Sequence, residues 1–253
     1  MSDSFRTLSG RAELLAATDN DPYIRWECDD QLLTRAWVLG DGAAFLRKSH
    51  HRGTTHLNLF GSEQDADLLL RNLVDADLLA DGVDGISVEQ SLLPVAERHF
   101  ALGRGGDWDW MWTVDEPSAQ PGEAAVIELD DDADGAELLA LNEIGSPTAE
   151  SRPGEGITEL WLGVREKGRI LAAGAMHRTG GGAPHLAGIV THPDARGRGF
   201  GAAVTAALTR AALERSGVAS LGMYSDNDVA RRLYHRLGFR TAHAWASRGF
   251  AVG

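Results

Sequence analysis

Hydrophobic and polar residues follow two different periods along this chain, and segments of each period alternate. Where apolar residues recur at every second position we expect strands, and where they recur at every third or fourth position we expect helices. In the second half, this rule predicts strands at 124–129, 159–166, 169–177, 185–191, 219–224 and 240–250, and helices at 132–144, 199–215 and 227–237. Gly217 and Gly238 closely follow the last two helices, a position typical of a residue that ends a helix.

The first half of the chain shows the same order of elements. The pattern predicts a hairpin at 33–39 and 43–49, strands at 54–60, 85–90 and 107–113, and helices at 62–76 and 92–101. Helix, strand, helix and strand recur roughly 135 residues later at a nearly constant offset, which indicates an internal duplication. An unrelated α+β domain in the first half is the alternative.

A polar connection separates the two halves. Residues 115–123 carry two prolines and lack apolar periodicity, which is typical of a linker. We therefore divide the chain into one domain at 1–120 and a second domain at 121–253. Both contain strands mixed with helices, so the expected fold class is α+β.

Composition is that of an ordinary globular protein, with 43% apolar and 24% charged residues. The single cysteine, Cys28, excludes an internal disulfide, and the carboxylates of Glu27, Asp29 and Asp30 disfavour the thiolate that a nucleophile needs. No basic segment followed by an apolar run opens the chain, and no apolar run approaches the length of a membrane span. We expect a cytoplasmic protein that does not associate with membranes.

Charge is distributed unevenly along the chain. The formal net charge of −13 argues against general nucleic-acid binding. Residues 160–253 nevertheless hold 13 Lys and Arg against 5 Asp and Glu, a net of +8, whereas residues 1–120 hold 10 against 21, a net of −11. An anionic small molecule is expected to be drawn to the second half and a cationic one to the first. Exposed arginines on helices are the simpler alternative for the basic segment.

The segment that joins the strand at 185–191 to the helix at 199–215 is the most informative. Residues 192–201 are HPDARGRGFG. Glycines at a strand-to-helix turn let backbone N–H groups converge, and the helix N-terminus adds positive potential, so this turn is expected to bind phosphate. A dinucleotide fingerprint fits less well, because a proline and four other residues separate the strand from the first glycine. A turn without a ligand is the other alternative.

A second motif, NDVARRLYHRLGF, spans residues 227–239. Asp226 or Asn227 is expected to cap this helix. Tyr234 lies on the apolar face of the helix, so its ring is expected to point inward. By itself, an inward tyrosine is more simply interpreted as a core residue.

These two motifs, in this order and about 30 residues apart, resemble the GNAT superfamily of acyl-CoA-dependent N-acyltransferases. The resemblance covers residues 124–250. It implies a mixed, mostly antiparallel sheet flanked by helices, with acetyl-CoA as the co-substrate and no metal. It also implies a tandem of a degenerate N-terminal copy and a complete C-terminal copy, because residues 59–63 of the first half lack the arginine–glycine cluster.

The resemblance assigns the coenzyme contacts to three places. The first is the turn, which holds the pyrophosphate. The second is the backbone of the preceding strand, which splays from its neighbouring strand and pairs with the pantetheine. The third is an asparagine on the next helix. These contacts fall on Arg196, Gly197, Arg198, Gly199, Phe200 and Gly201, on Ile189, Val190 and Thr191, and on Asn227.

The implied reaction is direct attack of an amine on the thioester, without a covalent enzyme intermediate. Tyr234 is the implied acid that protonates the departing thiolate, and a backbone N–H near Val190 is expected to stabilise the carbonyl oxygen. His185 stands where many relatives carry a glutamate and is the candidate base. Glu159 acting through water, or no direct side-chain base at all, are the alternatives.

We therefore expect an N-acetyltransferase that acts on a small amine or a peptide amine, as a monomer or homodimer. The alternative is a non-catalytic acyl-CoA-binding or regulatory module, and a dinucleotide-dependent oxidoreductase is less favoured.

Two further groups of residues are expected to be structural. The alternating Trp108, Trp110 and Trp112 face one way, and core packing or a seam between the halves is favoured over an aromatic wall for the acceptor. His50 and His51, together with His56, fit no common zinc spacing and are expected in a solvated loop.

Overall fold

The computed structural model describes residues 4–49, 53–79, 82–147 and 151–251. The first half contains β1 (Arg6–Leu8), α1 (Arg11–Ala17), α2 (Pro22–Glu27), β2 (Leu33–Leu39), β3 (Gly42–Lys48), β4 (Thr55–Phe60), α3 (Glu63–Asp75), β5 (Gly85–Glu89), α4 (Leu93–His99) and β6 (Leu102–Thr113). The second half contains β7 (Val126–Leu129), α5 (Gly135–Gly145), β8 (Leu160–Glu166), β9 (Arg169–Arg178), β10 (Pro184–Thr191), α6 (Phe200–Ser216), β11 (Ala219–Tyr224), α7 (Asp228–Arg236) and β12 (Arg240–Phe250).

Every helix and strand that the sequence predicts is present, with ends that differ by a few residues. Gly217 and Gly238 lie directly beyond α6 and near the end of α7, as expected. The pattern missed β1, α1 and α2, which have 3, 7 and 6 residues and are too short for a period to show. Local chemistry nevertheless specifies α2, because the Asp21 side chain accepts hydrogen bonds from the N–H groups of Tyr23 and Ile24.

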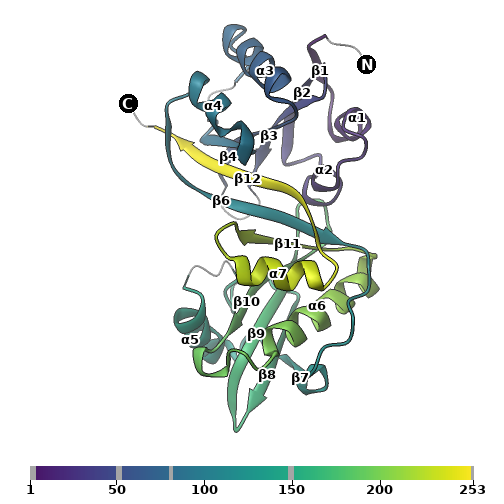
Figure 1. Cartoon of the computed structure of the whole chain (residues 1–253), viewed down its shortest axis with the longest axis vertical. Coiled ribbons are helices and arrows are strands. Elements are labelled where there is room, and N and C mark those ends of the chain that lie inside the picture. The colour runs from purple at the N-terminus through teal and green to yellow at the C-terminus, as the bar shows by residue number, and fades with distance from the viewer. Residues whose placement is uncertain (1–3, 50–52, 80–81, 148–150, 252–253) are drawn as a thin grey trace.

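Within the described ranges, twelve strands form one continuous sheet with helices on both faces (Figure 1). β4 pairs with β5 and β10 with β11 in parallel, and every other neighbouring pair is antiparallel. The expected class, an α+β protein with a mostly antiparallel mixed sheet flanked by helices, is confirmed. Each half contains a hairpin, a parallel strand pair joined through a helix, a second helix and a last strand.

The two halves exchange their last strands. The sheet order is β1-β2-β3-β4-β5-β12-β6-β11-β10-β9-β8-β7, so β12 of the second half lies between β5 and β6 of the first (Figure 1). Correspondingly, β6 lies between β12 and β11. The boundary between residues 120 and 121 falls in the connection between β6 and β7. We propose that this boundary separates the two units of the internal duplication. Each unit completes the sheet of the other.

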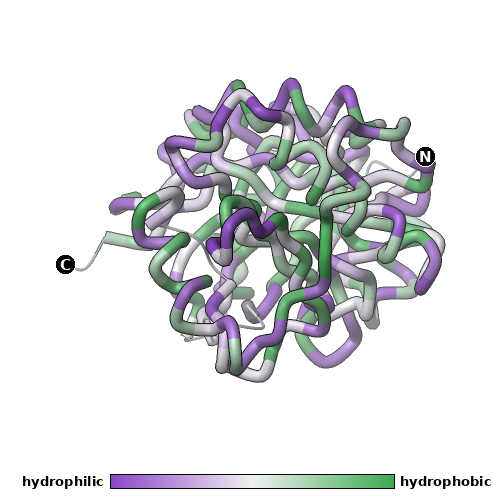
Figure 2. The backbone as a smooth tube through the Cα atoms, turned by 90° about the horizontal axis from the view of Figure 1, so that it is seen from below, coloured by the Kyte–Doolittle hydropathy of each residue, from purple (hydrophilic) through white to green (hydrophobic). Residues whose placement is uncertain are grey.

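The apolar core fills both faces of the sheet. On one face, here called the α6 face, α6 and α7 cover one cluster of the core and α3 and α4 cover another. On the opposite α5 face, α1 and α2 cover the third cluster and α5 covers the fourth. Figure 2 shows hydrophobic stretches crossing the interior of the molecule.

The three tryptophans of β6 lie on the α5 face. Trp110 is fully buried, and its Nε1 donates to Glu27 Oε2 at 3.2 Å. Trp108 and Trp112 pack, partly buried, against the same cluster. The interpretation of this alternating run as core packing is confirmed.

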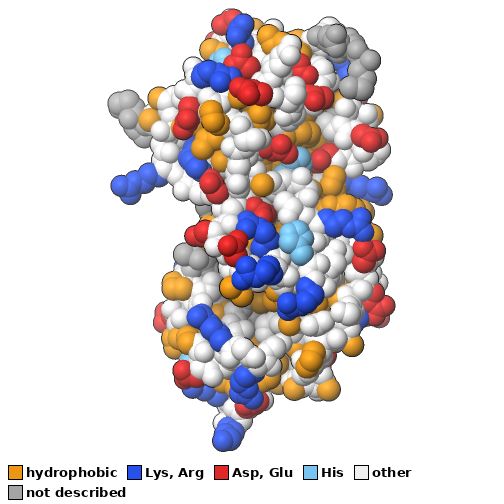
Figure 3. Space-filling model, viewed as in Figure 1, with side chains coloured by type: hydrophobic (Ala, Val, Ile, Leu, Met, Phe, Trp, Pro, Cys, Tyr) orange, Lys and Arg blue, Asp and Glu red, His pale blue; other side chains and the backbone are white. Residues whose placement is uncertain are grey.

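Charged side chains cover the surface. On the face drawn in Figure 3, Lys and Arg side chains lie over the lower part of the molecule, where Figure 1 places α7 and α6. Among the described residues, no helix is both long enough and apolar enough to cross a membrane.

A buried histidine joins β12 to the first half. His243 Nε2 lies 2.9 Å from Asp21 Oδ2, and its Nδ1 lies 2.8 Å from Glu89 Oε1. The ring also stacks on Trp245, with centroids 4.6 Å apart. Burial alone would lower the pKa of His243, but the hydrogen bonds to Asp21 and Glu89 outweigh it and raise that pKa to about 9.

This arrangement predicts that the protein loses stability as the pH rises. Because the folded-state pKa lies above the value of about 6.5 in the unfolded chain, the stabilisation is complete below that value and is lost as pH rises through 9. The loss is expected to be on the order of 3 kcal/mol. Urea unfolding of the wild type and of His243→Gln between pH 6 and pH 10 measures it. A wild-type pH dependence identical to that of the variant would contradict the prediction.

Candidate functional site

β10 and β11 diverge in the middle of the sheet. They pair only through His185 with Ser220 and Leu186 with Leu221. The register between β9 and β10 shifts between Ala187 and Val190, which is the signature of a β-bulge. Beyond these pairs, residues 187–191 of β10 and 222–224 of β11 no longer bond to each other. We call this region the splay.

The predicted strand contacts Ile189, Val190 and Thr191 all lie in the splay. The Ile189 side chain packs toward α6, whereas Val190 is buried on the α5 face. Their backbone groups on the β11 side have no strand partner, and unpaired backbone N–H and C=O groups are the groups that an extended ligand can bind.

The corresponding strands of the first half do not diverge. β4 and β5 pair through four successive residues, from His56 with Gly85 to Leu59 with Val88, and the register between β3 and β4 has no shift. The first half therefore offers no equivalent place for an extended ligand between its parallel strands.

The glycine-rich turn leads from the splay into α6. The His192 side chain accepts from Asp194 N–H and caps a short 3₁₀ turn at Pro193–Ala195. Gly199, with φ +82°, is the N-cap of α6, and no side chain caps this helix. The first hydrogen bond of the helix runs from Ala203 N–H to Gly199 C=O, so the N–H groups of residues 200–202 have no helical acceptor. A helix end of this kind is suited to bind an anion.

The two arginines of the turn are placed differently. Arg198 forms a two-pronged ion pair with Glu166, at 3.0 and 2.5 Å, and lies 4.4 Å from the ring centroid of Phe200. Arg196 makes one long contact, 3.4 Å, to the carbonyl of Gly145. Of these two arginines, Arg198 has a carboxylate partner, and Arg196 has none among the described residues.

The equivalent helix of the first half is already occupied at its N-terminus. Ser62 caps α3 by accepting from Asp65 N–H, and Asp41 Oδ1 accepts from Ser62 N–H. This backbone hydrogen bond is the main reason why the pKa of Asp41 lies below its usual range. With Glu63 also in the first turn, the site is acidic and would repel phosphate.

α7 carries the second motif. Asn227 is its N-cap, and Asn227 Oδ1 accepts from Ala230 N–H at 3.1 Å. Tyr234 points inward, as predicted, and is 8% exposed within the cluster that contains Leu186 and Met223, one on each side of the splay. Burial raises the pKa of Tyr234 to about 12, so the phenol is protonated at neutral pH.

A carboxylate from the exchanged strand anchors α7. Asp109 of β6 is 4% exposed and binds Arg231 Nε at 3.0 Å through Oδ2. Its Oδ1 accepts from Ser225 Oγ at 2.5 Å, just before the helix. The sequence analysis missed Asp109. The sequence signal that could have identified Asp109 is its position as a charged residue between the alternating tryptophans of this strand.

His185 lies at the closed end of the splay, on the face opposite Tyr234. Leu186 points to the α6 face, and side chains alternate along a strand, so His185 points to the α5 face. Its Nδ1 lies 3.0 Å from Ser220 Oγ, and its ring lies 5.1 Å from that of His177. The sheet thus separates the candidate acid from the candidate base.

The other candidate base is held by arginines. Glu159 Oε1 accepts from Arg178 Nε at 2.6 Å, and its Oε2 accepts from Arg215 at 3.3 Å. Both carboxylate oxygens of Glu159 are therefore held in ion pairs with arginines.

The structure places the other candidate residues outside any reactive cluster. Cys28 is fully buried, and burial raises the pKa of its thiol to about 12, so it is not nucleophilic. His56 lies in β4, partly buried and 3.1 Å from Ser87 Oγ, so its expected place in a solvated loop was wrong. His50 and His51 lie outside the described residues. No group of three or more His, Cys, Asp or Glu in the described part of the chain could hold a metal ion.

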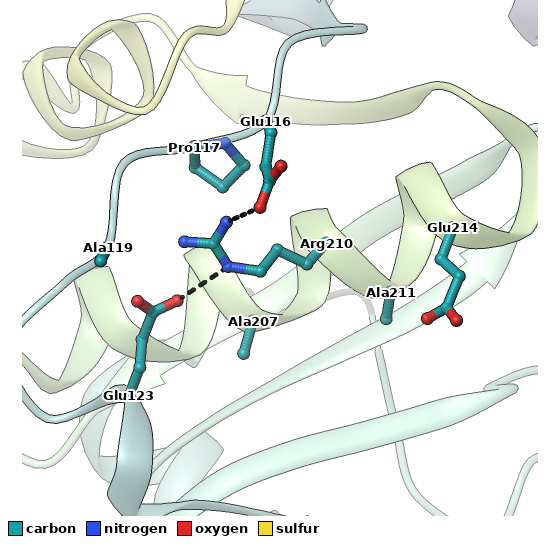
Figure 4. Close-up of a pocket in the computed structure, with 8 residues that line it drawn as sticks. All are labelled: Glu116, Pro117, Ala119, Glu123, Ala207, Arg210, Ala211 and Glu214. Carbon is teal, nitrogen blue, oxygen red and sulfur yellow. Dashed lines mark hydrogen bonds and ion pairs between the residues drawn. The ribbon is translucent and has the colours of Figure 1, made fainter.

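A large surface pocket lies away from this site. It has a volume of about 730 Å³ and lies between the linker and the outer side of α6 (Figure 4). Arg210 crosses it, bound to Glu116 at 2.6 Å and to Glu123 at 3.3 Å. These ion pairs fasten the linker to α6.

Known proteins resemble this chain in fold over nearly its whole length. Residues 161–247 match the family described as FR47-like protein. A GNAT-family acetyltransferase from Novosphingobium aromaticivorans superimposes with a TM-score of 0.53 at 19% identity, covering 94% of this chain and 97% of that one. A GCN5-related N-acetyltransferase from Sphaerobacter thermophilus gives 0.54 at 17% identity, covering 98% and 96%. One from Kribbella flavida gives 0.51 at 20%, covering 97% and 98%. These similarities confirm the expected resemblance to GNAT proteins at the level of the fold.

Proposed function

We propose that this chain, which has the GNAT acetyltransferase fold, transfers an acetyl group from acetyl-CoA to a primary amine of a small molecule or peptide. The observation that carries the proposal is the splay between β10 and β11, which leads directly into the uncapped N-terminus of α6. A long, partly extended thioester with a pyrophosphate at one end fits such a surface.

The coenzyme would bind in two parts. The turn from Arg196 to Gly201 would hold the pyrophosphate through the N–H groups at the start of α6. The pantetheine arm would run along Ile189, Val190 and Thr191 and use their unpaired backbone groups. Asn227 would contribute to coenzyme binding indirectly, because its side chain caps the N-terminus of α7.

Residues on the two sides of the splay would divide the chemistry. His185 takes up the proton that the ammonium loses before attack. The amine nitrogen then attacks the thioester carbonyl, a C–N bond forms, and the C–S bond breaks, while a backbone N–H near Val190 stabilises the charge on the carbonyl oxygen. The nitrogen releases its second proton to solvent as the amide forms, and Tyr234 donates its proton to the departing thiolate and recovers one from solvent.

The first half would support the site without binding coenzyme. It supplies Asp109, which anchors the helix of Tyr234, and its own helix N-terminus is filled by Ser62 and Asp41. Its net charge of −11 over residues 1–120 favours the approach of a cationic amine. We therefore expect one coenzyme molecule per chain.

Two glycines of α6 provide a matched test of the coenzyme site. Gly199 and Gly217 cap opposite ends of the same helix with φ of +82° and +70°, so alanine strains both backbones similarly. Gly199→Ala is expected to weaken coenzyme A binding about tenfold. The backbone would change conformation to relieve the strain, and this change would reorient the N–H groups of the turn away from the pyrophosphate. Gly217→Ala should bind as the wild type does. Calorimetry gives the affinity and the stoichiometry.

Release of free thiol from acetyl-CoA across a panel of amines tests the reaction itself. Amine-dependent release supports an acetyltransferase. Binding of acetyl-CoA without release on any amine would favour a non-catalytic binding module. Failure to bind coenzyme A, or binding of a second molecule in the first half, would overturn the proposal.

The Arg198–Glu166 ion pair predicts a variant with higher affinity. Glu166→Gln would release Arg198 toward the phosphates, and since exposed pairs contribute up to about 1 kcal/mol, the affinity for coenzyme A should rise by roughly two- to fivefold at low salt. Glu128→Gln makes the same charge change on the edge strand β7. Equal affinity of both variants would contradict the prediction.

A further inference from the structure

On the α5 face, the β10 side of the splay is covered. Gly188, with φ +59°, lies in the register shift of this strand, and a Cβ on it would lie 3.0 Å from the Cβ of Ser151. Ser151 is fully buried. Val190 points to the same face and is 4% exposed, packed against the leucines of α5. The described residues therefore leave no approach to the splay over β10.

The β11 side of the same face is open. Leu221 and Met223 pack into the cluster on the α6 face, so the alternate residues Gly222 and Tyr224 point to the α5 face. Gly222 is exposed and is the first residue of β11 beyond its last pair with β10. Tyr224 is 48% exposed, the one aromatic among the exposed large hydrophobic side chains of the described ranges. A ligand can therefore reach the splay over these two residues.

Aromatic atoms border this opening. A Cβ on Gly222 would lie 3.7 and 3.9 Å from Cε3 and Cζ3 of Trp108 and 3.9 Å from the ring of His185, and these are its three nearest contacts. Trp108 is also the register partner of Tyr224. Core packing and a 2.9 Å hydrogen bond from Trp108 Nε1 to Ser247 Oγ hold this indole in place. Its free edge is therefore a fixed apolar wall beside an exposed glycine.

We propose that Gly222, Tyr224 and the edge of Trp108 form the subsite for the carbon skeleton of the acceptor, and that the protein acts on primary amines that carry an aromatic or other apolar group. The inference deepens the proposed function and rests on it. The proposed acid, Tyr234, lies on the α6 face, so the thiolate departs there and the amine attacks from the α5 face. Aromatic side chains offer a large apolar area at a small entropic cost, and their ring faces attract an ammonium group.

Two primary amines of similar basicity test the preference. 2-Phenylethylamine carries an aromatic ring, whereas ethanolamine carries a hydroxyl group in its place. We expect kcat/KM of the wild type to be at least about tenfold higher for 2-phenylethylamine, because only this amine has apolar area to bury in the subsite. Equal values, or a preference for ethanolamine, would overturn the inference.

Variants of the subsite locate the source of this preference. Tyr224→Ala is expected to lower kcat/KM for 2-phenylethylamine about tenfold, through KM, and to affect ethanolamine much less, whereas Tyr224→Phe keeps the ring and should retain the preference. Gly222→Ala places a methyl group at ordinary contact distance from Trp108, so it should keep the strand and cause the same selective loss. Equal losses on both amines would overturn the inference.

Val229 provides the matched control for exposed apolar area. It is 72% exposed and lies on α7, away from the α5 face. Val229→Ala should therefore change kcat/KM for neither amine. A selective loss on 2-phenylethylamine in this variant as large as that in Tyr224→Ala would contradict the assignment of the subsite to β11.

Binding of the amine separates this inference from the proposed function. Saturation-transfer NMR of 2-phenylethylamine, with and without coenzyme A, should show its ring protons in contact with the wild type and not with Tyr224→Ala. Such binding without turnover on any amine would refute acetyl transfer and leave the subsite intact. Turnover without discrimination between the two amines would overturn the subsite and leave the proposed function intact. Absence of both binding and turnover would overturn both.

Discussion

Replacement of Tyr234 by phenylalanine is expected to lower kcat about 10²- to 10³-fold while the affinity for acetyl-CoA stays unchanged. The change removes the hydroxyl that would protonate the departing thiolate and keeps the ring that packs with Phe239, 6.0 Å away. Because the pKa of Tyr234 is raised to about 12, the wild-type phenol carries its proton throughout the neutral range. Steady-state thiol release and calorimetric titration with coenzyme A measure the two quantities.

Tyr23 provides the matched control for this variant. It is fully buried in the core of the first half, and among the described residues its hydroxyl has no hydrogen-bond partner. Tyr23→Phe should therefore keep wild-type turnover, since it removes a buried hydroxyl that binds nothing. If Tyr234→Phe kept half of the wild-type kcat, Tyr234 would not be the acid.

Substitution of Gly105 by alanine is expected to destabilise the protein by about 4 kcal/mol, the largest effect on stability predicted here. Gly105 lies on β6 where it pairs with β12, and a Cβ there would lie 1.8 Å from the backbone oxygen of Ser247. Backbone atoms cannot move aside as the end of a flexible side chain can, so the exchanged strands must separate locally. For a chain of this length the melting temperature should fall by about 10 °C.

The neighbouring glycine separates this clash from the general effect of alanine in a strand. A Cβ on Gly106 meets nothing within 4 Å, so Gly106→Ala should leave the melting temperature within a few degrees of the wild type. Thermal unfolding of both variants decides the matter. Equal melting temperatures would show that β12 does not lie against β6 as the exchanged arrangement requires.

The local features of the site could be predicted from the sequence because each depends on neighbours in the chain. Glycines and a proline indicate the turn at 192–199, and helical spacing of apolar residues indicates α6 and α7. The predicted bounds of these two helices were therefore close to the observed ones. The inward orientation of Tyr234 followed from the same period. The capping role of Asn227 was one of two open choices, and the structure selects it over Asp226.

The pairing of charges could not be predicted in this way. Arg198 was expected to add charge for phosphate, but it is bound by Glu166, which lies 32 residues earlier in the chain at the end of β8. Asp109 was missed because its partner Arg231 lies 122 residues away in the sequence, on α7. Contacts of this kind depend on which strands are neighbours, and periodicity carries no information about that.

By itself, the sequence determined the order of strands and helices, the glycine turn before α6 and the inward tyrosine of α7, because short-range spacing and backbone conformation specify them. Only the tertiary structure decided that β6 and β12 change places between the halves, that β10 and β11 part after two residue pairs, and that His185 and Tyr234 lie on opposite faces of the sheet. The physical reason is that strand pairing joins hydrogen-bonding groups that every residue carries. The partner is therefore chosen by the packing of the whole sheet and its helices rather than by the strand's own residues.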